Sequence, residues 1–300
     1  YAMHTLSFEK RRDRGECELP QLAHAFFSVE SLVMDLMADD FHLKIRAEKP
    51  ASYPLRQRIS IDEAPWFQDS HTYDPPYFVD PSVLENDRIL TEGGWADPEQ
   101  FDHVQVEREA AETKYHDDLG RPLNPRGRTG IAGRGLLGRW GSNPAVAAVV
   151  VRTTGGIGGC EILVGRRSGQ TGFELPEGFV LPSELDRDAM VRVVKNDTGW
   201  EPAGSEYPIV FRGYIYDSRQ TDHAWIDGQA YLIAQPATDV PDVFSGSDHY
   251  EEFNWMPLDS DIVNQLPLRQ AQFVRNAVQQ LLTDGVLAVG QAEALLAKTG

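Results

Sequence analysis

The stretch Gly178–Trp200 decides the fold, and it reads GFVLPSELDRDAMVRVVKNDTGW. Within it, Glu184–Asn196 is predicted to form a helix. Segments with the apolar pattern of strands lie on both sides of the stretch. A helix set between strands in this way predicts an α/β fold.

Strands and single helices alternate over residues 141–300. The expected strands are Val146–Arg152, Glu161–Gly165, Val210–Tyr216, Ala224–Ala234 and Phe253–Met256. Leu268–Leu282 is amphipathic, and residues 286–298 are expected to form a short terminal helix. This order predicts a mixed sheet sandwiched by helices.

Residues 50–140 have a different composition, with closely spaced prolines and interleaved aromatic residues. Dense proline prevents long helices and favours extended segments joined by turns. We therefore expect a smaller, irregular α+β accessory or cap domain. It ends in a loop rich in glycine and arginine, residues 126–141, which is interpreted as facing an anion, with a flexible interdomain hinge as the alternative.

Residues 1–49 form a third region. One apolar helical stripe is predicted from Leu22, Phe26, Val29, Val33 and Leu36. A short strand is predicted from the alternation of Phe41, Leu43 and Ile45 with polar residues. The stripe is too short to favour a coiled coil over packing on the same protein.

Composition and charge exclude several classes of protein. The formal net charge of −18 argues against a nucleic-acid partner, which needs a basic face. No apolar run approaches the length that spans a bilayer, so membrane insertion is not expected. Cys17 and Cys160 are too few for a disulfide framework or a zinc site. With no apparent secretion leader, we expect a soluble intracellular protein, cytoplasmic, with a mitochondrial location left open.

The stretch Gly178–Trp200 resembles the Nudix box. That pattern is Gly, five residues, Glu, seven residues, then Arg-Glu-apolar-x-Glu-Glu-x-Gly-apolar. The positions that match it at the correct spacing are Gly178, Glu184, Arg192, Val194, Gly199 and Trp200.

The flanking motifs are similar to those of the ADP-ribose pyrophosphatase branch of the Nudix superfamily. They include the segment Leu123–Asn143, which contains the loop rich in glycine and arginine, the run Gly213–Trp225, and Tyr73-Asp74-Pro75-Pro76. The same domain forms the cytosolic C-terminal end of ADP-ribose-gated melastatin-type TRP cation channels. The resemblance covers residues 50–283 and implies a Nudix α/β/α sandwich, with ADP-ribose bound in the cleft between it and the accessory domain. It also implies a possible attachment to a larger polypeptide such as an ion channel.

The metal site implied by this resemblance is degenerate. In the family, three Glu positions of the box hold Mg²⁺, and here they are Val193, Asn196 and Asp197. Asp197 is the one carboxylate left to bind metal. A rewired metal site is the alternative, with Asp197 joined by carboxylates that otherwise form a solvated acidic face: Glu174, Glu177, Asp186 and Asp188. Glu184 and Arg192, which brace the box loop in the family, are both present.

The ligand-binding residues implied by the resemblance are better preserved. Asp217 and Arg219 match residues that hold the terminal ribose and the neighbouring phosphate, and a turn with a local ion pair is the alternative. Asn143 is expected to make a polar contact at the cleft. Arg128 and Arg134 are expected either to face phosphates or to brace the domain interface.

The sequence predicts one function and leaves two alternatives open. The first is an ADP-ribose-binding sensor or regulatory module with little or no hydrolysis, which binds ADP-ribose or a related nucleotide diphosphate. The second is an active Mg²⁺-dependent ADP-ribose pyrophosphatase that yields AMP and ribose 5-phosphate. The third is a structural scaffold whose pocket no longer binds nucleotide.

Overall fold

The computed structural model describes residues 49–297, apart from 61, 101–113, 155–158, 205, 245–246 and 248. All of them belong to one compact unit, Lys44–Gly300. The helix expected between Leu22 and Leu36 and the strand expected around Leu43 lie outside the described residues. Within the described part of the chain, no helix has the length and apolar character needed to cross a membrane.

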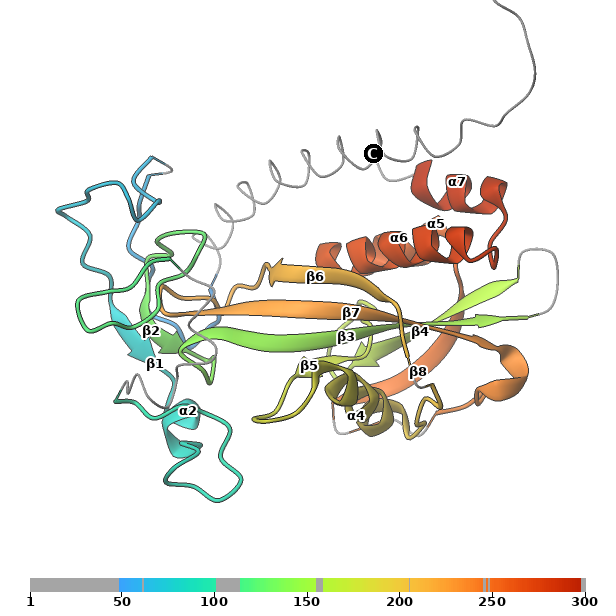
Figure 1. Cartoon of the computed structure of the whole chain (residues 1–300), viewed down its shortest axis with the longest axis horizontal. Coiled ribbons are helices and arrows are strands. Elements are labelled where there is room, and N and C mark those ends of the chain that lie inside the picture. Colours follow the sequence, from blue (N-terminus) through green and yellow to red (C-terminus); the bar gives the residue numbers. More distant parts are fainter. Residues whose placement is uncertain are drawn as a thin grey trace, which may run out of the picture. The chain divides into compact units, whose positions relative to one another are not determined.

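The larger part of the described chain is built on a mixed sheet with the strand order β6-β7-β3-β4-β8, in which β5 also pairs with β3 (Figure 1). The strands are β3 (Gly141–Thr153), β4 (Cys160–Arg167), β5 (Glu177–Phe179), β6 (Ile209–Ile215), β7 (Ala224–Pro236) and β8 (Tyr250–Pro257). Strands β3 and β7 run parallel, whereas the other pairs are antiparallel. The sequence prediction of an α/β fold with a mixed sheet is therefore confirmed.

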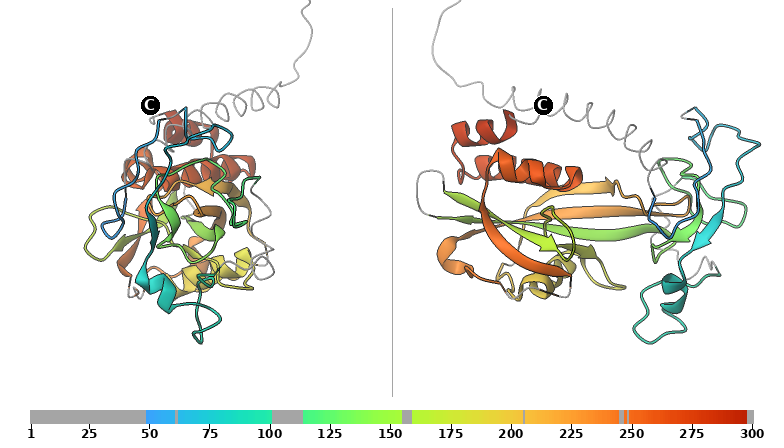
Figure 2. Two further views of the ribbon diagram at one scale, coloured as in Figure 1. Left: turned by 90° about the vertical axis from the view of Figure 1, so that its left-hand side faces the viewer. Right: turned by 180° about the vertical axis from the view of Figure 1, so that it is seen from behind.

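Helices cover both faces of this sheet (Figure 2). Helix α4 (Asp186–Thr198) lies on one face, and α5 (Ser260–Gln265), α6 (Leu268–Thr283) and α7 (Val289–Ala297) lie on the other. Strand β3 serves both layers, since alternate side chains of a strand point to opposite faces. Val146, Ala148 and Val150 pack with the α4 layer, and Ala147, Val149 and Val151 pack with the α6 layer. A strand buried on both faces reads as a continuous apolar run, as this one does.

Helix α4 begins two residues later than the sequence prediction, at Asp186 instead of Glu184. Leu185 has an extended backbone, with φ of −82° and ψ of 142°, so it precedes the helix, and the side chain of Glu184 pairs with Arg192. Ser183, directly before these two residues, has φ of 65°. The helix ends at Thr198, because Gly199 adopts a left-handed conformation with φ of 75° and donates its N–H to the carbonyl of Lys195.

The accessory domain is small and irregular, as expected from its prolines. Its regular elements among the described residues are β1 (Tyr77–Val79), α2 (Pro81–Glu85) and β2 (Ala132–Gly135). Strands β1 and β2 form a two-stranded parallel sheet. Helix α2 begins where Asp80 accepts a hydrogen bond from the N–H of Ser82, with Pro81 in the first turn, where proline is tolerated.

The left-handed conformation at Ser183 generates a stability prediction. An L-residue in this conformation costs about 1 kcal/mol that glycine avoids. We expect Ser183→Gly to raise the free energy of unfolding by about 1 kcal/mol, and Gly199→Ala to lower it by about the same amount. Urea denaturation of both variants measures this. A destabilised Ser183→Gly protein would contradict the assignment of strain.

Candidate functional site

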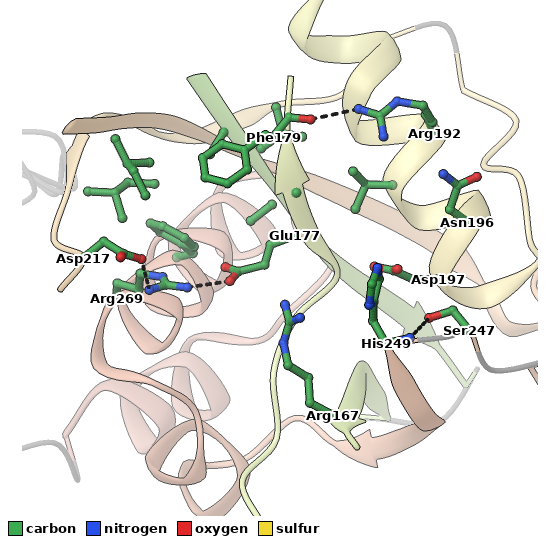
Figure 3. Close-up of a pocket in the computed structure, with 18 of the residues that line it drawn as sticks. Arg167, Glu177, Phe179, Arg192, Asn196, Asp197, Asp217, Ser247, His249 and Arg269 are labelled. Atoms are coloured by element: carbon green, nitrogen blue, oxygen red, sulfur yellow. Dashed lines mark hydrogen bonds and ion pairs between the residues drawn. The ribbon is translucent and has the colours of Figure 1, made fainter. Parts of the chain in front are cut away.

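A cavity of about 690 Å³ lies beside α4, between β3, β5 and the start of α6 (Figure 3). Its walls are contributed by residues between Ala145 and Phe273, so every lining residue belongs to the sandwich. The accessory domain lines no part of this cavity, and the ligand cleft expected between the two domains stays a prediction. The volume suits a ligand of nucleotide size.

The loop between β5 and α4 is held by the pair Arg192 and Glu184. Nε and Nη2 of Arg192 donate to the two oxygens of Glu184 at 2.6 and 2.8 Å. Nη2 also donates to the carbonyl of Phe179, and Glu184 accepts the N–H of Leu181. The hydrogen bonds from Arg192 hold the pKa of Glu184 below its usual value. The structure thus contains the brace that the family resemblance implies.

A chain of alternating charges crosses the cavity wall opposite α4. The guanidinium of Arg219 donates to both oxygens of Asp217 at 2.7 Å and stacks on the ring of Phe179. Arg269 lies between Asp217, at 3.5 Å, and Glu177, to which it donates a hydrogen bond (Figure 3). Burial alone would raise the pKa of Asp217, but Arg219 holds it below its usual value. Asp217 therefore stays ionised.

Asp197 is a buried carboxylate in the wall formed by α4. Only 7% of it is exposed, and its Oδ2 atom accepts no hydrogen bond from the described residues. Burial raises its pKa to about 6, against the opposing charges of Arg167 and His249. This oxygen is therefore a buried acceptor for which the described residues supply no donor.

The described residues do not fit Mg²⁺. The ion prefers several carboxylate oxygens, and among the residues described no group of three His, Cys, Asp or Glu side chains lies together. Val193 packs in the core. It lies so close to Gly178 that a Cβ atom added to this glycine would come within 2.8 Å of the valine side chain. The carboxylates of the rewired alternative have partners elsewhere: Glu174 with Arg167, Glu177 with Arg269, Asp186 with Gln229 and Asp188 with Arg187.

Three residues predicted to contact ligand lie away from this cavity. Arg128 donates to backbone carbonyls of the accessory domain, those of Glu63, Pro65 and Gln68. Arg134 is fully buried and donates to Asp97, Gly138 and Glu99. These contacts correspond to the bracing alternative. Asn143 is also buried, and its side chain bonds the backbone of Arg139 and Gly141.

Sequence reasoning missed three side chains of the cavity: Arg167, Arg269 and His249. Arg167 ends β4 and is oriented by Glu174 at 2.5 Å. Arg269 lies in the first turn of α6. The sequence predicts the start of this helix correctly, but nothing in the helical pattern indicates a binding role. His249 precedes β8. They come together only because three distant segments meet at one side of the sheet.

Two family models match consecutive parts of the chain. The model described as NUDT9-like, N-terminal domain matches residues 59–141, and the NUDIX domain model matches residues 141–279. The putative nudix hydrolase 6 of Caenorhabditis elegans is 34% identical over 186 residues, covering 54% of this chain and 67% of that protein. The chain belongs to the Nudix family.

Two further relatives are similar to this chain in sequence. The mitochondrial ADP-ribose pyrophosphatase of Rattus norvegicus is 27% identical over 285 residues, covering 79% of this chain and 77% of that enzyme. The transient receptor potential cation channel subfamily M member 2 of Mus musculus is 29% identical over 215 residues, covering 65% of this chain. The match spans 14% of the length of that channel. The resemblance to the ADP-ribose pyrophosphatase branch is confirmed.

The raised pKa of Asp197 predicts how stability depends on pH. Below about pH 3 the carboxyl is neutral in the folded and unfolded protein, and above about pH 6 the folded protein must bury its charge. We expect Asp197→Asn to raise the free energy of unfolding by about 2 kcal/mol at pH 7.5 and by little at pH 4. Asp188→Asn, which changes an exposed carboxylate on the same helix, is the control. An equal gain at both pH values would contradict the burial of charge.

Proposed function

We propose that this chain binds ADP-ribose or a closely related nucleoside diphosphate in the cavity beside α4, hydrolyses it little or not at all, and acts as a sensor or regulatory module. The observation that carries the proposal is a concentration of arginine in an acidic protein. Arg167, Arg192, Arg219 and Arg269 line the cavity, although the net charge of the chain is −18.

These arginines suit a diphosphate. A bidentate pair with a carboxylate uses two of the five N–H donors of a guanidinium, so donors remain for phosphate oxygens. Each guanidinium is also oriented by its own acid: Arg167 by Glu174, Arg192 by Glu184, Arg219 by Asp217 and Arg269 by Glu177. Oriented donors lose little conformational freedom when the ligand binds.

Acceptors at both sides of the cavity suit the sugar part of such a ligand. Asp217 lines the cavity on one side, and Asp197 lines it on the other. Ribose hydroxyls are donors to carboxylates, and because both oxygens of Asp217 already accept from Arg219, a hydroxyl there would share or replace one of these bonds. The name of the rat relative, an ADP-ribose pyrophosphatase, supports ADP-ribose within this class.

The weakness of the metal site supports a binding role over hydrolysis. Hydrolysis of a diphosphate in this family relies on Mg²⁺, which would neutralise the phosphates and activate water. Of the three box positions, Val193 has no ligand atom, Asn196 is neutral, and Asp197 has a pKa raised by burial. In this proposal the arginines bind the diphosphate without bound metal.

The alternative is a working Mg²⁺-dependent ADP-ribose pyrophosphatase that forms AMP and ribose 5-phosphate. Asp197 favours it, because this residue lines the cavity at a box position that binds metal in the family, and its buried Oδ2 atom accepts no hydrogen bond from the described residues. A scaffold with no ligand is the third possibility. For the sensor, similarity to the mouse channel supports attachment to a larger polypeptide, whose conformation ligand binding would shift by its differential affinity.

The pocket assignment is tested by calorimetric titration with ADP-ribose in the presence of Mg²⁺, followed by mass spectrometry of the recovered solution. We expect saturable binding and intact ligand. Asp217→Asn and Arg219→Gln should each weaken binding at least about tenfold, since each removes a charge-assisted hydrogen bond. Asp242→Asn, which breaks an exposed ion pair with Arg152, should bind normally.

Each result decides between the three functions. Unchanged affinity in the Asp217 and Arg219 variants would refute the pocket. Accumulation of AMP with the unmodified protein would favour the pyrophosphatase. If the titration shows no binding heat and no AMP forms, the structural scaffold is the remaining interpretation.

The degenerate box generates a separate prediction. Val193→Glu combined with Asn196→Glu restores two carboxylates beside Asp197. We expect this double variant to form AMP at least about tenfold faster than the Val193→Gln, Asn196→Gln double variant, which matches it in size without the charges. Equal rates, in proteins of equal thermal stability, would show that the loss of these glutamates does not limit hydrolysis.

A further inference from the structure

The accessory domain contributes no lining residue to the described cavity, yet it bonds closely to a loop that does. Residues 217–220 form this ligand loop, between β6 and β7, and they include Asp217 and Arg219. Three consecutive backbone carbonyls of the loop, those of Ser218, Arg219 and Gln220, accept hydrogen bonds from side chains of the accessory domain.

Tyr53 provides the central bond. Its hydroxyl accepts the N–H of Leu136 at 2.7 Å and donates to the carbonyl of Arg219 at 2.6 Å. Tyr53 is buried, which raises the pKa of its hydroxyl and keeps it protonated as a donor. Gly135 permits this approach, because a Cβ there would lie 2.0 Å from the tyrosine oxygen.

Arg56 provides the flanking bonds. Its Nη2 donates to the carbonyls of Ser218 at 2.7 Å and Gln220 at 2.9 Å, on either side of the residue that Tyr53 binds. Its Nη1 donates to the carbonyl of Thr129, in the glycine-arginine loop. One guanidinium therefore ties the ligand loop to the accessory domain.

We propose that Tyr53 and Arg56 are positioning residues that set the ligand affinity of the cavity by fixing the ligand loop before the ligand arrives. The backbone carbonyl of Arg219 accepts a hydrogen bond from Tyr53 of the accessory domain. Its side chain contacts Asp217 and Phe179, which line the cavity. A loop ordered in advance does not lose this conformational freedom on binding. The inference rests on the proposed function, because it concerns the affinity of the same site.

The test uses a matched pair of tyrosines. Tyr207 also accepts one backbone N–H, from Gly204, and donates to one carbonyl, that of Pro202, but it does not touch the ligand loop. Tyr53→Phe should weaken ADP-ribose binding about tenfold by calorimetry, whereas Tyr207→Phe should change it less than twofold. Arg56→Lys keeps the charge but not the two-carbonyl geometry, and it should weaken binding as Tyr53→Phe does.

Hydrogen exchange in the ligand-free protein provides a second readout. The amides of Arg219 and Gln220 are bonded to Asp217, and they should exchange faster in Tyr53→Phe and not in Tyr207→Phe. Normal exchange at these amides in Tyr53→Phe, or normal affinity despite faster exchange, overturns the inference. If the unmodified protein does not bind ADP-ribose, the proposed function fails. The inference about affinity then fails with it, even if hydrogen exchange shows that Tyr53 orders the ligand loop.

Discussion

The parallel pairing of β3 with β7 is the interaction on which the rest of the structure depends. The register runs from Gly141 opposite Ala224 to Thr153 opposite Pro236, and both faces of β3 are buried under helices. Parallel strands need a long connection, and here that connection includes β4, β5, α4 and β6. The pairing therefore brings helix α4 and the ligand loop to the same strand. The cavity lies where β5 pairs with β3 at Ala145–Ala147.

Most carboxylates in the cavity form ion pairs with arginine side chains and orient them. A guanidinium loses hydration when it is buried, and a paired acid offsets that cost while fixing its direction. Glu177 illustrates the consequence, since its two oxygens accept from Arg269 and Gln270. A carboxylate used in this way has little capacity left for a cation. The same chemistry that favours an anionic ligand thus works against a metal site.

The regular elements of the sandwich were largely predictable from the sequence, because apolar periodicity reflects burial. Helix α6 is expected over Leu268–Leu282 and is observed over Leu268–Thr283. The short strand β5 was missed, since three residues, Glu177–Phe179, carry no periodic signal. The start of α4 was misplaced, since the conformation of Ser183 and the pairing of Glu184 with Arg192 depend on contacts beyond the local pattern.

The sequence by itself determined the family, the order of the longer strands and helices, and the loss of two box glutamates, because these are properties of residue type and spacing. Only the tertiary structure decided which arginines face the cavity. Arg128 belongs to the most conspicuous arginine-rich loop, but carbonyls 60 to 65 residues earlier in the chain bind its guanidinium. Arg167 and Arg269 stand in ordinary strand and helix patterns and line the cavity. The direction of a guanidinium depends on which acceptors the fold brings near it, and spacing along the chain does not contain that information.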